Sequence, residues 1–141
     1  MKLRKFAIMG LSLFAFAGFS MAADDESPLA KLMEQVQNKT NAIRKATRNA
    51  AEYKKASGSI AKDAETIVKL AREAREIKEP AEKEKKPMAE WQKLMDDMIK
   101  STEDLAKVTA KSGSTQAQAK EAFTAYTKTC TACHNVFKKD E

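Results

Sequence analysis

Residues 115–139 read TQAQAKEAFTAYTKTCTACHNVFKK, and this stretch decides both the architecture and the chemistry of the chain. Its apolar side chains recur at helical spacing, so that they share one face of a helix. A threonine at the start is typical of an N-cap residue. The stretch therefore predicts an amphipathic helix from about Thr115 to Lys139, whose inner face carries Ala119, Ala122, Phe123, Tyr126, Cys130, Cys133, His134 and Phe137.

Cys130, Cys133 and His134 form a C-x-x-C-H motif and are the only two cysteines and the only histidine of the sequence. In an exported chain this motif is typical of c-type haem attachment. Each thiol forms a thioether with one porphyrin vinyl group, and the histidine binds the iron. Separations of three and four residues place the three side chains on one helix face, where they can meet one flat macrocycle. We therefore predict one covalently attached haem c, with His134 as axial iron ligand.

Two other readings of the motif fit less well. A redox-active dithiol is expected within a mixed β/α pattern, which the sequence lacks. A structural zinc ion needs about four protein ligands, and the motif supplies three.

The first residues are typical of a bacterial export signal. Lys2, Arg4 and Lys5 precede an apolar run over residues 6–19, and Ser20-Met21-Ala22 offers small residues for cleavage. The run is short for a membrane-spanning helix, which needs about 20 apolar residues. We expect residues 1–22 to be a cleaved signal peptide and residues 23–141 to form a single periplasmic domain, with no membrane insertion after cleavage.

The charge of the mature chain is small. The full chain carries 26 Lys and Arg against 20 Asp and Glu, and the signal accounts for three of these cations. The remaining excess of about three positive charges does not indicate nucleic acid as a partner. The abundance of Ala, Lys, Glu, Gln and Met favours helices.

Three further amphipathic helices are expected before the last one. Their apolar periodicity and stop signals place them at about residues 27–53, 59–79 and 87–111, separated by Ser57-Gly58-Ser59 and by a charged linker after Pro80. Four helices with short connections predict an all-α, up-down-up-down four-helix bundle that carries the haem near the C-terminus.

This topology suggests a second iron ligand. The first and last helices are expected to be antiparallel neighbours, so that Met33 and His134 lie at about the same level on buried faces. A thioether opposite an imidazole is a known haem ligand pair. Met88 and Met95 on the third helix are alternatives, and Trp91 is expected to pack on the macrocycle. Phe123, Tyr126 and Phe137 complete the predicted pocket.

The segment Cys130–Lys138 on the fourth helix resembles the class II cytochromes c, the family that contains the cytochromes c′ and their low-spin relatives. Residues 32–46 and 88–95 are also similar to the soluble b-type cytochrome with the same bundle. In that protein the methionine that corresponds to Met33 is an axial ligand. Cytochromes c′ often have basic residues where this chain has Leu29, and arginine where it has Lys138. At the position of Met33, cytochromes c′ have an apolar residue that does not bind the iron. Together these differences favour the low-spin branch of the family.

The resemblance implies an electron carrier with His134 and Met33 as axial ligands. The alternative is a five-coordinate cytochrome c′-like protein that binds NO or CO. An enzyme is not expected, because no carboxylate cluster or nucleophile–base pair is visible. The sequence does not identify the redox partner. Lys31, Lys128 and Lys138 are candidates for steering an acidic one. The resemblance also allows a homodimer through the first two helices.

Overall fold

The computed structural model describes residues 27–138, which form five α-helices and contain no strand. The helices are α1 (Pro28–Ala46), α2 (Ala50–Arg75), α3 (Glu79–Lys83), α4 (Met88–Ala110) and α5 (Gln116–Phe137). The expected signal peptide, residues 1–22, lies outside the described residues. Within the described part of the chain, no helix has the length and apolar content required to cross a bilayer.

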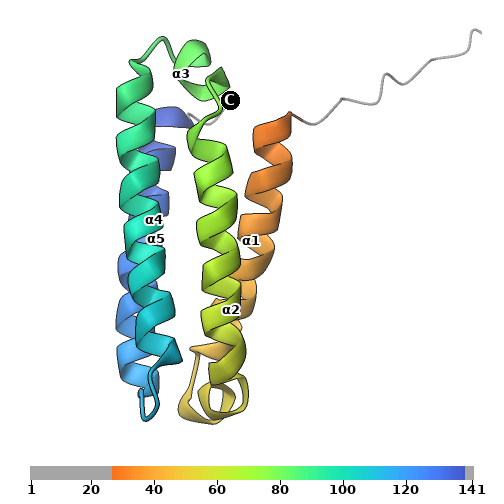
Figure 1. Ribbon diagram of the computed structural model, residues 1–141, viewed down its shortest axis with the longest axis vertical. Helices are drawn as coiled ribbons and strands as arrows, with labels where there is room; N and C mark the ends of the chain where they lie inside the picture. Colours follow the sequence, from red (N-terminus) through yellow and green to blue (C-terminus); the bar gives the residue numbers. More distant parts are fainter. Residues whose placement is uncertain (1–26, 139–141) are drawn as a thin grey trace, which may run out of the picture.

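The four long helices form the predicted up-down-up-down bundle. Helix α2 packs against α1 and α4, and α4 packs against α5, so that consecutive long helices are neighbours (Figure 1). The N-terminal ends of α1 and α4 and the C-terminal end of α5 lie at the end of the bundle that α3 covers. The turns between α1 and α2 and between α4 and α5 lie at the opposite end (Figure 1). Direct packing of α1 against α5 is slight compared with the other pairs.

The apolar stripes of the helices meet in one core. Its fully buried side chains are supplied by all four long helices and include Ile43, Ile60, Ile67, Met95, Leu105 and Tyr126. Burial of a large aliphatic side chain contributes about 1.5–3 kcal/mol. The 3.6-residue periodicity in the sequence therefore reports the faces that are buried.

The boundary between the first two helices differs from the prediction. We expected a helix to about Tyr53 and a turn at residues 57–59, but α1 ends at Ala46 and α2 runs through Gly58. Asn49 is the N-cap of α2, and its side chain accepts a hydrogen bond of 3.0 Å from the backbone N–H of Glu52. An N-cap contributes about 1 kcal/mol, which offsets the similar cost of one glycine inside a helix.

The segment between α2 and α4 also differs from a simple linker. The second helix ends at Arg75 and not at about Glu79, and the short helix α3 begins immediately before Pro80. Proline is well tolerated in a first helical turn, because the first N–H groups have no helical partner. Pro80 therefore begins a helix here instead of stopping one, and it is buried together with Ala81.

Gly58→Ala is expected to raise the free energy of unfolding by about 0.5–1 kcal/mol. Gly58 lies inside α2 without a positive φ angle, and an added Cβ would meet no atom within 4 Å. The measurement is urea unfolding of both proteins followed by circular dichroism at the helical band.

Gly113→Ala is the matched control and should lower the stability. Gly113 also has open space around it, but its φ angle of 79° is one that alanine rarely adopts. A loss of stability in Gly58→Ala would contradict the helical conformation of residues 57–59.

Candidate functional site

The C-x-x-C-H motif occupies the last two turns of α5, at the end of the bundle covered by α3. The side chains of the motif differ in burial: Cys133 is buried, Cys130 is half-buried and His134 is exposed. Neither cysteine is part of a disulfide. The expectation that the whole motif lies on the buried face is therefore wrong for His134. The physical reason is that α5 packs on α4 at this level, whereas its side toward α1 has little helix packing.

The environment of the two thiols keeps them protonated. Burial raises the pKa of the Cys133 thiol to about 11, and the neighbouring Cys130 adds to this effect. Burial also raises the pKa of Cys130, whose Sγ lies 3.6 Å from the carbonyl oxygen of Tyr126. Thiols with raised pKa values are poor nucleophiles and poor ligands for stray metal ions at neutral pH.

A set of apolar side chains around the motif is only partly buried, although each contacts the core. Three helices contribute to it at this end of the bundle: Leu29, Leu32, Met33, Met88, Leu94, Cys130 and Phe137. A porphyrin is a large apolar disc with polar edges, so it fits a half-exposed apolar surface that also presents two thiols and an imidazole. The donor set and the apolar lining both fit a covalently attached haem.

A buried hydrogen bond fixes the register of α1 against α5. The Tyr126 hydroxyl lies 2.7 Å from Thr40 Oγ1, and both side chains are buried. Thr40 donates its own hydrogen to the carbonyl oxygen of Val36, so Tyr126 is the donor of the pair. A second contact between these helices lies nearer the opposite end, where Gln116 Nε2 donates to the carbonyl oxygen of Thr47.

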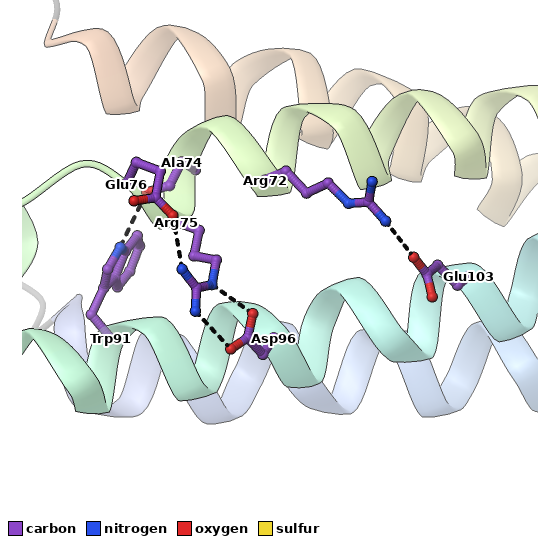
Figure 2. A network of polar contacts seen from close by, with 7 residues as sticks. All are labelled: Arg72, Ala74, Arg75, Glu76, Trp91, Asp96 and Glu103. Atoms are coloured by element: carbon purple, nitrogen blue, oxygen red, sulfur yellow. Dashed lines mark hydrogen bonds and ion pairs between the residues drawn. The ribbon is translucent and has the colours of Figure 1, made fainter.

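Trp91 connects three helices at the same end as the motif. Its indole Nε1 donates a hydrogen bond of 3.1 Å to the carbonyl oxygen of Ala74, in the last turn of α2 (Figure 2). Its ring makes an edge-to-face contact with Phe137 of α5, with centroids 5.3 Å apart. The same carbonyl oxygen accepts a backbone hydrogen bond of 3.1 Å from Ile77 N–H, so the indole adds a second donor at this end of α2.

Ion pairs hold α2 beside α4 next to Trp91. The guanidinium of Arg75 binds both carboxylate oxygens of Asp96 and also contacts Glu76. One turn before Arg75 on α2, Arg72 binds Glu103 of α4 at 2.8 Å (Figure 2). These pairs are largely exposed, and their contribution is a defined alignment of the helices more than stability.

The remaining predicted pocket residues separate into two groups. Met88 is half-buried near the start of α4, and Met95 is 1% exposed inside the core. Phe123 and Tyr126 contact each other, with ring centroids 6.0 Å apart. They precede His134 by 11 and 8 residues, which is about 16 and 12 Å along α5. Phe123 therefore lies in the middle of the bundle, and Tyr126 supports the site through α1.

Two features of the site escaped the sequence-based prediction. Leu94 is one of the half-buried apolar side chains near the motif. It follows Trp91 by three residues, so the helical repeat could have placed it on the same face of the helix as Trp91. The bond from Trp91 to the carbonyl of Ala74 had no signal, because a backbone acceptor cannot be distinguished from its neighbours by residue type.

Comparison with known proteins gives one result. The family described as Cytochrome C′ matches residues 29–138, which are most of the chain. No curated protein and no solved structure gives a significant match.

Tyr126→Phe is expected to lower the free energy of unfolding by about 1–2 kcal/mol, because a fully buried hydrogen bond is lost without replacement by water. The change removes only the hydroxyl that contacts Thr40 and leaves the ring in the core. The measurement is urea unfolding at neutral pH.

Tyr53→Phe is the matched control. The Tyr53 hydroxyl also makes one side-chain hydrogen bond, 2.5 Å from Ser114 Oγ, but this bond is only partly buried. Water replaces a partly exposed partner, so the loss of stability should be smaller. An equal or larger loss in Tyr53→Phe would show that the Thr40–Tyr126 bond has no special role.

Proposed function

Because this chain belongs to the cytochrome c′ family and is thereby a c-type cytochrome, we propose that it carries single electrons on a haem attached at Cys130 and Cys133, with His134 and Met33 as axial ligands. The bound haem supplies an iron that changes between the ferrous and ferric states. The protein supplies the attachment, the two axial donors and the surrounding apolar side chains.

The register of α1 against α5 is the observation that carries the proposal. Met33 precedes Thr40 by seven residues, and Cys133 follows Tyr126 by seven. At 1.5 Å per residue, both are about 10.5 Å from the Thr40–Tyr126 hydrogen bond, and His134 is about 12 Å from it. The antiparallel arrangement of the two helices therefore supports a common level for the thioether and the imidazole.

The two other methionines are less suitable as ligands. The contact between Trp91 and Phe137 gives the register of α4 against α5, and it places Leu94 near the level of His134. Met88 lies six residues before Leu94, or about 9 Å further toward the end of the bundle. Met95 is at the right level, but its side chain is 1% exposed within the core. Met33 is half-buried and needs no repacking of the core to reach a ligand.

Two axial donors on different helices suit electron transfer. Methionine and histidine bind iron in both oxidation states, and this pair raises the reduction potential. A bundle that fixes both helices also limits rearrangement on oxidation. The half-buried apolar side chains around the motif would exclude water from a bound haem iron. No position then remains for a substrate, which agrees with the proposal that the protein is a carrier and not an enzyme.

The family match also favours a second candidate, a five-coordinate protein that binds NO or CO, as the resemblance to cytochromes c′ implies. In this case Met33 would be an apolar wall residue of the pocket. The two candidates differ in the spin state of the iron, which is high-spin with five ligands.

We also propose a periplasmic location after removal of residues 1–22, together with a redox partner protein that meets the end of the bundle near the motif. A docking surface for acidic side chains requires exposed cations. Three exposed lysines are available: Lys31 in the first turns of α1, Lys128 in α5 and Lys138 directly after α5. Faster electron transfer at low ionic strength would accompany such docking.

Met33→Ala is the decisive test of the axial pair. The intact protein, matured with its haem, is expected to show a low-spin ferric spectrum with a weak sulfur-to-iron charge-transfer band at the red end. Met33→Ala should abolish this band and give a high-spin spectrum, because the iron loses one strong ligand. Absorption and electron paramagnetic resonance spectra provide the measurement.

Met88→Ala is the matched control, since Met88 is also a half-buried methionine at this end of the bundle. It should leave the band unchanged. A high-spin spectrum of the intact protein would refute His/Met ligation and support the gas-binding candidate. Loss of the band in Met88→Ala alone would assign the ligand to Met88.

A further inference from the structure

The net charge of the described residues is concentrated at the end of the bundle opposite the C-x-x-C-H motif. Residues 44–55 and 111–120 contain seven basic side chains and one acidic side chain, Glu52. The rest of residues 27–138 contains 15 basic and 14 acidic side chains and is therefore almost neutral. We call the first group the basic end; its cations are Arg44, Lys45, Arg48, Lys54, Lys55, Lys111 and Lys120.

The two segments of the basic end form one surface. Residues 44–55 span the turn from α1 to α2, and residues 111–120 span the turn from α4 to α5; both turns lie at the same end (Figure 1). Two hydrogen bonds connect them: Gln116 Nε2 to the carbonyl oxygen of Thr47 at 2.7 Å, and Tyr53 Oη with Ser114 Oγ at 2.5 Å. The cations are therefore held on a common, structured surface.

Most of these cations lack a compensating carboxylate. All seven are exposed, and only Lys55 forms an ion pair with a described residue, at 3.8 Å from Glu52. By contrast, several charges at the other end of α2 and α4 are paired, such as Arg75 with Asp96 and Lys86 with Glu90. Clustered like charges repel one another and are unfavourable for folding, so an external anion would relieve this repulsion.

We propose that the basic end binds the surface of a membrane rich in anionic phospholipids, so that the protein associates with it peripherally. Clusters of four to eight exposed Lys and Arg are typical of segments that bind anionic headgroups. The proposal is independent of the identity of the second iron ligand.

The composition of the basic end favours a lipid surface over a protein partner. Specific protein interfaces depend on a few exposed aromatic or large apolar side chains that enter pockets. The exposed apolar side chains of the basic end are alanines, such as Ala50 and Ala51, whereas Tyr53 is buried. A surface of exposed Lys and Arg side chains without large apolar side chains recognises the density of negative charge and not the shape of a partner. A layer of anionic headgroups presents such a charge density.

Binding at this end would leave the haem site accessible. Gln116 and Cys130 are separated by 14 residues of α5, or about 21 Å along the helix. The motif therefore points away from a membrane that holds the basic end. The protein would stay concentrated at the surface while its redox end meets soluble partners.

The test is co-sedimentation of the purified holoprotein with phosphatidylcholine vesicles that contain or lack phosphatidylglycerol. Binding is expected only with phosphatidylglycerol, and it should weaken strongly above about 0.15 M salt, where charges are screened beyond about 8 Å. The triple variant Arg48→Glu, Lys54→Glu, Lys111→Glu should reduce the partition coefficient about tenfold or more.

The control variant Lys69→Glu, Lys100→Glu, Lys128→Glu changes the net charge equally, at exposed lysines outside the basic end. It should retain most of the binding. Circular dichroism and the haem spectrum verify that both variants are folded. Equal losses in the two variants, or binding that does not depend on phosphatidylglycerol, would overturn the proposal. Binding to polyglutamate without binding to anionic vesicles would also overturn it and would indicate an acidic protein partner.

Discussion

The hydrogen bond between Thr40 and Tyr126 is the constraint on which the site depends. Helices α1 and α5 pack against different neighbours, α2 and α4, and have little direct packing with each other. Their relative height is therefore not set by interdigitating side chains over most of their length. This buried bond selects one register, because a shift of one turn would leave the Tyr126 hydroxyl without its partner in the core, whereas Thr40 would keep its bond to Val36. That register brings Met33 level with Cys133 and His134.

The sequence predicted the helices wherever periodicity and stop signals agree, and it failed where two signals compete. Gly113 both follows an apolar stripe and adopts a positive φ angle, so the turn before α5 was placed correctly. Gly58 has no such requirement, and the helix continues through it. The competing signal was Asn49 with Glu52 three residues later, which is typical of a helix start. Propensity alone cannot rank such signals, since each is worth only about 1 kcal/mol.

The site was predictable to the extent that its chemistry is local. The motif Cys130–His134 lies within two turns of one helix, so its spacing alone indicates haem attachment. The exposure of His134 was not predictable, because it depends on how closely α1 approaches α5. The bond from Trp91 to the backbone of Ala74 also depends on tertiary contact. Sequence reasoning therefore identifies the donor residues, and the packing of the helices determines which of them share a level.

The two ends of the bundle differ in the kind of side chain that they expose. Near the motif, apolar side chains remain half exposed and the charged side chains are mostly balanced by opposite charges, which suits a large apolar cofactor. At the other end the large apolar side chain, Tyr53, is buried, and all the cations except Lys55 lack an ion pair with a described residue. A four-helix bundle permits this separation, because its core needs only the inner face of each helix and leaves both ends free to vary. The chain thus separates cofactor binding from surface attachment along the length of the same helices, and a change of charge at the basic end should leave the iron ligands undisturbed.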